Sequence, residues 1–104
     1  MVLSLGDNFY SNGVESIDDP LWDKAYANIY PKMSYLKDLT WYGVIGNHDF
    51  RGLGLFTEFE YKKNNWRIDD FFWTHTDIVE GNRIAFIHID TNFLAEGIEG
   101  SSAQ

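Results

Sequence analysis

The amino-acid sequence predicts an α/β fold in which strands alternate with helices and a β-hairpin follows. Two short apolar runs, at 2–5 and 40–46, each stop at a glycine, which is typical of buried strands. The segment between them has apolar residues at helical spacing. The last third of the chain contains two segments rich in aromatic and β-branched residues, joined by a short turn. We therefore expect a sheet layered with helices.

Two helices are predicted. The first begins after Asp19, a good N-cap residue, with Pro20 at the first helical position, and Pro31 ends or kinks it. Its expected apolar face is formed by Trp22, Ala25, Tyr26, Ile29 and Met33. The second helix covers 55–64, where two lysines near the end suit the helix dipole. Its apolar residues are Leu55, Phe56 and Phe59.

The hairpin is predicted from 70–79 and 83–90, with Gly81-Asn82 as its two-residue turn. The tail 96–104 is small and polar, and we expect it to fray. Open α/β sheets bind ligands just beyond the carboxyl ends of their strands. The residues that follow the first two predicted strands are therefore the candidates for a site.

Composition restricts the function. The chain has 104 residues, enough for one modest domain, and its 44% hydrophobic content predicts a packed core. The net charge of −8 argues against nucleic-acid and membrane-surface partners, because no basic patch exists to bind phosphate groups. The absence of cysteine excludes disulfides and thiolate metal sites. Neither a signal peptide nor an apolar run of membrane-spanning length is visible.

The stretch GDNFY follows the first predicted strand. Gly6 lets a ligand approach the backbone, and the Asp7 carboxylate can bridge two cations. Tyr10 can add a phenolate oxygen if a cation is acidic enough to remove its proton. The alternative is structural: an aspartate that makes a turn hydrogen bond and a tyrosine at the edge of the core.

The stretch GNHD follows the second predicted strand. Asn47 offers a neutral amide oxygen, and His48 offers an imidazole that can bind a metal or donate a proton. Asp49 can orient either one through a hydrogen bond. The alternative is a polar turn after a strand, which also suits glycine, asparagine and aspartate.

The two motifs occur in the order G-D-x-x-Y and G-N-H-D, separated by one predicted helix. In the longer strings LGDNFYSNGV and WYGVIGNHDF, together with IAFIHIDT, which ends at Asp90 and Thr91, the chain resembles the metallophosphoesterase superfamily. Within it the chain is most similar to the purple (tartrate-resistant) acid phosphatases. The resemblance implies a partial calcineurin-like domain over 1–95, belonging to an α/β/β/α sandwich, followed by the polar tail 96–104.

The resemblance also implies a two-metal centre of iron(III) and a divalent iron, zinc or manganese ion, acting on a phosphomonoester substrate. Asp7 matches the bridging aspartate, Tyr10 the tyrosinate bound to iron, and Asn47 the amide ligand of the divalent ion. His48 matches the catalytic histidine that binds phosphate and protonates the leaving alcohol. Two such cations can activate a water molecule and clamp an in-line displacement.

Parts of the family pattern are absent. The chain lacks the upstream Asp-x-Gly block, the downstream lone histidine and the Gly-His-x-His block. His75 and His88 do not occur in those contexts, and we expect them to be structural or surface histidines. Each ion would receive two ligands, whereas well-held sites usually have three or more protein ligands. We therefore expect a fragment of a phosphatase that is inactive alone, with an exposed sheet edge or core face.

Two other functions remain open. One is a noncatalytic protein with the same fold, which binds a ligand or partner through exposed aromatics at 71–73. The other is a nuclease or other phosphodiesterase of the superfamily, against which Tyr10 and the acidic charge argue. Family members are secreted or lie in lysosomal or vacuolar compartments. The sequence does not indicate the substrate, the divalent metal, the compartment or the oligomeric state.

Overall fold

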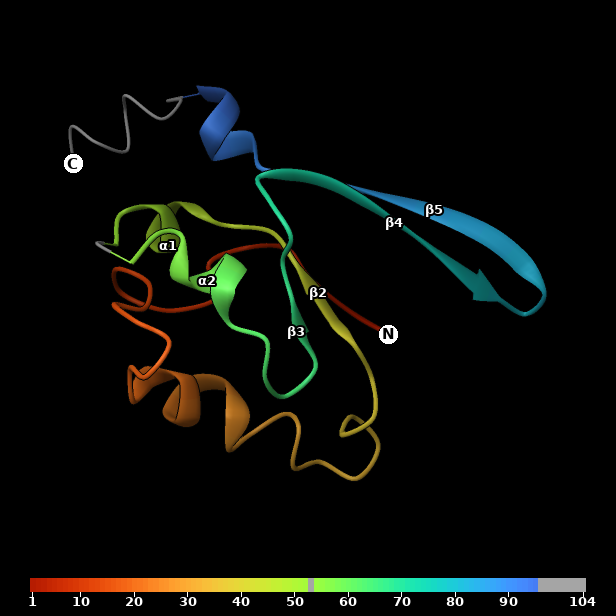
Figure 1. The fold of residues 1–104 in the computed structure, drawn as a ribbon, viewed down its shortest axis with the longest axis horizontal. Coiled ribbons are helices and arrows are strands. Elements are labelled where there is room, and N and C mark those ends of the chain that lie inside the picture. The colour runs from red at the N-terminus through yellow and green to blue at the C-terminus, as the bar shows by residue number, and fades with distance from the viewer. Residues whose placement is uncertain (53, 96–104) are drawn as a thin grey trace.

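A computed structural model describes residues 1–52 and 54–95 of the chain. Three short strands form a parallel sheet in the order β1-β2-β3, with β2 in the middle (Figure 1). They span Val2–Ser4, Trp41–Gly43 and Trp66–Arg67. The first two confirm the predicted strands, although both are shorter than expected. The third was not predicted, because two residues are too few to show an alternating pattern.

The hairpin forms a second sheet from β4 (Phe72–Val79) and β5 (Asn82–Ile89), which projects from the body of the molecule (Figure 1). Val79 pairs with Asn82, so Glu80 and Gly81 form the turn. The predicted turn is therefore wrong by one residue. Both turn residues have positive φ, 52° and 79°, which matches the right-handed twist of the flanking strands.

The first predicted helix is present but short. The Asp19 carboxylate accepts hydrogen bonds from the backbone N–H groups of Glu15 and Leu21, at 2.8 and 2.9 Å. The chain then forms the π-helix η1 (Asp23–Ala27), in which the N–H of Asn28 donates to the carbonyl of Asp23, five residues back. Extension to Met33 is wrong, since turns replace the helix before Pro31.

The other helices are single turns. The predicted helix over 55–64 is reduced to α2 (Thr57–Glu60), because Tyr61 is extended and leads toward β3. The two lysines at 62–63 thus lie beyond the helix. GNHD, predicted as a turn or site loop, forms the helical turn α1 (Asn47–Phe50). A further helical turn covers residues 91–95, and the tail 96–104 lies outside the described residues.

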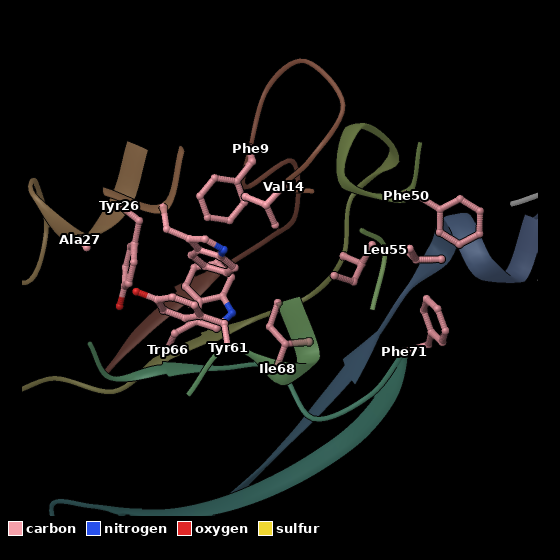
Figure 2. Close-up of a cluster of buried hydrophobic side chains, with 12 residues drawn as sticks. Phe9, Val14, Tyr26, Ala27, Phe50, Leu55, Tyr61, Trp66, Ile68 and Phe71 are labelled. Carbon is pink, nitrogen blue, oxygen red and sulfur yellow. The ribbon is translucent and has the colours of Figure 1, made fainter. Parts of the chain in front are cut away.

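Aromatic side chains form the centre of the core (Figure 2). Trp22 stacks on Tyr61 with 3.7 Å between ring centroids, while Phe9 and Trp66 meet Trp22 edge-on at 4.6 and 5.3 Å. Pairs of this kind contribute about 0.5–1.5 kcal/mol each beyond simple burial. Trp22 and Tyr26 confirm the predicted apolar helix face, but Ile29 and Met33 are exposed because the helix ends before them.

One face of the hairpin packs on the parallel sheet. The Trp73 indole N–H donates to the Gly43 carbonyl at 3.3 Å, and the His75 ring stacks on Tyr42 at 3.7 Å. Trp73 is therefore buried, and Phe71 is buried where its ring stacks on Phe93. The expectation of exposed aromatics holds only for Phe72.

The expected exposed edge and core face are present. Strand β1 lies at the edge of its sheet, and Leu3 and Leu5 are 45% and 90% exposed, so the first strand is not buried as predicted. On the outer face of the hairpin, Ile87 is 72% exposed. Within the described ranges, no helix has the length and apolar character needed to span a bilayer.

Candidate metal centre

The loops that follow β1 and β2 lie against each other at one end of the parallel sheet. Gly6 has φ of +99°, and a Cβ placed on it would lie 2.9 Å from the Cα of Gly46. A Cβ on Gly46 would overlap the backbone nitrogen and carboxylate of Asp7. The glycines of the two motifs therefore allow a backbone approach that no larger residue permits.

Asp7 lies at the junction of the two loops. Its φ of 50° places it in the left-handed region, which aspartate tolerates better than most residues. The carboxylate oxygen Oδ1 accepts a hydrogen bond from the backbone N–H of His48 at 3.0 Å. Oδ2 accepts one from the Tyr10 hydroxyl at 3.2 Å. The Asp7 carboxylate thus accepts hydrogen bonds from a residue of its own motif and from one of the GNHD motif.

Asn47 completes this group. When its amide nitrogen faces Asp7, it donates to Oδ1 and Oδ2 at 3.1 and 3.3 Å. When the amide oxygen faces Asp7 instead, the Asn47 oxygen and the Asp7 carboxylate are both acceptors, and a cation can lie between them. Oxygens at about 2.0–2.2 Å from a shared cation lie about 3 Å apart when they are cis to each other. The spacing of Asp7 to Asn47, and of Asp7 to Tyr10, therefore fits ligands of shared cations.

Tyr10 is 62% exposed beside this carboxylate. The hydrogen bond that its hydroxyl donates to Asp7 raises the pKa of Tyr10, and partial desolvation and the negative charges of Asp7 and Asp49 raise it further. The phenol is therefore neutral in the metal-free protein. Binding of Tyr10 to a cation requires loss of this proton.

His48 is held by the loop that carries Tyr10. Its Nδ1 lies 2.6 Å from the Ser11 carbonyl oxygen, so Nδ1 carries a proton and donates it there. The ring lies 4.5 Å from that of Tyr10. This arrangement leaves Nε2 as the nitrogen that can exchange a proton with a ligand.

Asp49 does not orient Asn47 or His48 as predicted. Its carboxylate is buried, at 2% exposure, and accepts hydrogen bonds from backbone N–H groups of both loops. The donors are Asn8, Phe9 and Gly46, each at 2.9 Å. Asp49 therefore clamps the backbones together. Sequence reasoning missed Asn8 and Glu58, which contact this carboxylate or lie beside it.

His75 and His88 lie away from the centre, on the inner face of the hairpin. Both are buried, and His75 Nδ1 lies 2.9 Å from His88 Nε2, a hydrogen-bond distance. The prediction of structural or surface histidines is met by its structural alternative, since both rings are buried. Across the described part of the chain, no cluster of three or more histidine, aspartate or glutamate side chains is arranged to hold a metal.

A cavity of about 320 Å³ adjoins the candidate ligands. Asp7 and Asn47 line this cavity together with Thr91 and Asn92. Asp90, the last residue of the IHID string, is buried beside them at 1% exposure. The cavity places open space next to two of the predicted ligands.

Comparison with known proteins decides the family. The Calcineurin-like phosphoesterase family model matches residues 1–100. The chain belongs to this family. Among curated relatives of this phosphoesterase, purple acid phosphatase 7 of Arabidopsis thaliana is 33% identical over 91% of the chain and 28% of its own length. Human tartrate-resistant acid phosphatase type 5 is 33% identical over 86% of the chain and 28% of its own length.

Purple acid phosphatase 3 of Arabidopsis thaliana is more similar over a shorter stretch, 53% identical over 49% of the chain and 13% of its own length. The phosphoesterase chain thus spans between about an eighth and three tenths of these relatives. A solved structure described as GAP50, the anchor in the inner membrane complex of Plasmodium, matches 90% of the chain and 33% of its own. Its TM-score of 0.70 at 23% identity confirms the fold.

Proposed function

We propose that this chain carries part of the two-metal centre of an acid phosphatase that hydrolyses phosphate monoesters. The observation that carries the proposal is the position of Asp7. Its carboxylate lies within 3.3 Å of the Tyr10 hydroxyl and of the terminal amide of Asn47. The purple and tartrate-resistant acid phosphatases among the relatives support the same reaction class.

Each ligand has a distinct electrostatic role in the proposal. Asp7 would be shared by the two ions, Tyr10 would bind iron(III) as a phenolate, and Asn47 would bind the divalent ion without adding negative charge. The neutral ligand keeps the ion pair net positive, which a phosphate dianion requires. When bound, the ions supply charge stabilisation and an activated water.

His48 is the proposed proton donor to the leaving alcohol. Its Nδ1–H donates to the Ser11 carbonyl, which leaves Nε2 as the nitrogen that would exchange a proton with the substrate. Ser11 also lines an open cavity of about 770 Å³ together with Asn12 and Arg51. We assign the leaving group to this cavity. A general acid in this position typically contributes about 10²–10⁴-fold to the rate.

A noncatalytic binding protein is the second candidate. Each ion would receive only two ligands among the residues named here, and the hairpin exposes apolar side chains such as Ile87 and Phe72 that a partner can cover. A phosphodiesterase of the same family lacks comparable support, because Tyr10 contacts Asp7 as the purple phosphatase assignment requires.

The test is to load the purified chain with iron(III) and zinc and to record metal content, visible absorbance and hydrolysis of an aryl phosphate. We expect a visible band that Tyr10→Phe abolishes and that Tyr35→Phe, an exposed tyrosine elsewhere, retains. A band that persists in the Tyr10 variant contradicts the iron–tyrosinate assignment. Bound metal with turnover shows a complete site, whereas metal binding without turnover supports a partial one. Absence of metal binding favours the noncatalytic candidate.

A further inference from the structure

A buried polar network lies beneath the two motif loops. Glu58, on α2, is 1% exposed, and Asp49 is 2% exposed. The side-chain amide of Asn8 donates to Glu58 Oε2 and to Asp49 Oδ2, both at 3.1 Å. The same amide nitrogen lies 2.9 Å from the Val44 carbonyl, and Asn8 Oδ1 accepts a hydrogen bond from Ser4.

The network joins two carboxyl groups with one amide. In the described part of the chain, no lysine or arginine pairs with either carboxylate. Two adjacent buried carboxyls cannot both be ionised, so one retains its proton. Burial raises the pKa of both carboxyls, and the neighbouring Asp49 raises that of Glu58 further, while backbone donors to Asp49 oppose the rise there. The geometry joins the pair through Asn8, whose amide nitrogen donates to one oxygen of each carboxyl group.

We propose that Glu58 is a positioning residue, which keeps the loop carrying Asp7 fixed against the loop carrying Asn47 and His48. Asn8 follows Asp7 directly, and its backbone N–H, like that of Gly46, donates to the Asp49 carboxylate. The Asn8 side chain ties the same carboxylate to Glu58. A displacement of Asn8 moves Asp7 with it. The consequence for metal binding rests on the proposed function, because metal ligands must keep their distances within about 0.2 Å.

A simple core-filling role predicts a different behaviour. If Glu58 only occupied volume, methionine would replace it without local effect, since the two side chains are similar in length. A positioning role requires an acceptor for the Asn8 amide. Glutamine keeps a carbonyl oxygen that accepts this bond, whereas the methionine thioether is only a weak acceptor.

The experiment compares Glu58→Gln, Glu58→Met and the control Glu60→Gln, an exposed residue of the same helix. Amide hydrogen exchange of the metal-free chain is followed at Asn8, Phe9 and Gly46 and across the β4–β5 hairpin. We expect Glu58→Met to lower protection at the three loop amides about tenfold or more relative to the hairpin. Glu58→Gln and the control retain wild-type protection.

Unchanged protection in Glu58→Met overturns the proposal, as does an equal loss in loops and hairpin. If this variant does not fold, Asn8→Ser is used instead, because it removes the amide between the carboxyls and keeps the backbone donors. Loss of protection at Phe9 and Gly46 then supports the proposal, and its persistence overturns it.

Iron titration of the same variants separates this role from the proposed function. We expect Glu58→Gln to bind iron as the wild-type chain does and folded Glu58→Met to bind at least tenfold more weakly. Equal affinity of the two variants overturns the link between Glu58 and the metal ligands. If the wild-type chain binds no iron, the proposed function fails, and the exchange measurement alone decides the role of Glu58.

Discussion

At the scale of single residues, close approach of two backbones determines whether the motifs form one site. Gly46 has an ordinary φ of −99°, so its backbone conformation does not require glycine. The requirement is steric, because a Cβ would overlap Asp7. Gly81 is the opposite case: its φ is +79°, and nothing lies within 4 Å of an added Cβ. Substitution of Gly46 therefore tests steric overlap, whereas substitution of Gly81 tests backbone strain alone.

We expect Gly46→Ala to destabilise the chain by about 3 kcal/mol, since the overlapped atoms are backbone and cannot rotate away. Gly81→Ala costs about 1 kcal/mol, the usual cost of a side chain in the left-handed region. Urea unfolding of both variants checks the difference. Equal losses contradict the close approach of the loops. Hydrogen exchange at the His48 amide should increase in the Gly46 variant alone, since His48 donates to Asp7.

Glu80 lies in the hairpin turn, where a different side chain is expected to stabilise the chain. Its φ of 52° carries a cost that asparagine largely avoids, and Asn-Gly is the preferred pair for such a turn. We expect Glu80→Asn to stabilise the chain by about 1 kcal/mol, which raises the Tm by about 4–8 °C for a domain of this size. Glu80→Gln serves as the control, since it removes the charge and keeps the strain. A Tm gain in the control equal to that of the asparagine variant contradicts the explanation.

At the scale of elements, the hairpin is held to the parallel sheet by rings that include two histidines. His75 lies between Tyr42 and Phe86, and His88 stacks on Trp73 at 4.0 Å. Burial lowers the pKa of both histidines, and the Arg67 guanidinium lowers it further, while Asp69 opposes the shift. Asp77 also opposes the shift at His75. The pair is therefore packed in its neutral form.

This packing predicts how stability depends on pH. Unfolded histidine titrates near pH 6.5, and the folded pair titrates lower, so the unfolded chain binds protons first as the pH falls. The stabilisation is complete above about pH 6.5 and is lost below it. We expect the double variant His75→Gln, His88→Gln to lose less unfolding free energy between pH 7 and pH 5 than the wild-type chain.

Urea unfolding at several pH values measures this difference. Thr76→Ala, on the exposed face of the same strand, is the control, because it leaves the histidine pair in place. The raised pKa of Glu58 makes the unfolding free energy rise as the pH falls, in every variant. The histidine contribution is therefore read from the difference between the variant and wild-type curves of unfolding free energy against pH. Parallel curves for the double variant and the wild-type chain contradict the assignment.

The sequence predicted some elements well because their signals are local. The hairpin and the strand-glycine motifs follow from the types of neighbouring residues. The ligand roles of Asp7, Tyr10 and Asn47 stay predictions that rest on the family resemblance. The helix after Asp19 was overestimated because its apolar spacing continues past the point where the chain turns before Pro31. Glu58 could not be connected to Asn8 from sequence, since they are 50 residues apart and meet only through packing. The sequence signal was the position of Glu58, a charged residue three places after Leu55 and thus on the expected apolar face of the helix.

At the scale of the whole molecule, the chain is less compact than its length predicts. The radius of gyration is 14.1 Å, compared with about 13 Å for a domain of 100 residues. The projecting hairpin accounts for the difference, and its strand β5 is apolar on both faces, a pattern typical of strands covered on both sides. Leu5 and Ile87 line an open groove between β1 and β5. The groove therefore leaves apolar side chains uncovered at the open edge of the parallel sheet.

The exposed apolar groove predicts that copies of the chain associate. Leu5 and Ile87 are 90% and 72% exposed, and exposed apolar patches promote association. We expect sedimentation of the wild-type chain to show a mass that rises with concentration, and the double variant Leu5→Lys, Ile87→Lys to reduce this rise. The unfolding free energy should change by less than about 0.5 kcal/mol, because neither side chain is buried. Tyr35→Lys, at a side chain that is 73% exposed and distant in sequence from both strands, shows the effect of one added lysine, half of the charge that the groove variant adds. If Tyr35→Lys reduces association as strongly as the groove variant, net charge rather than the groove determines the behaviour, and the apolar surface is inert.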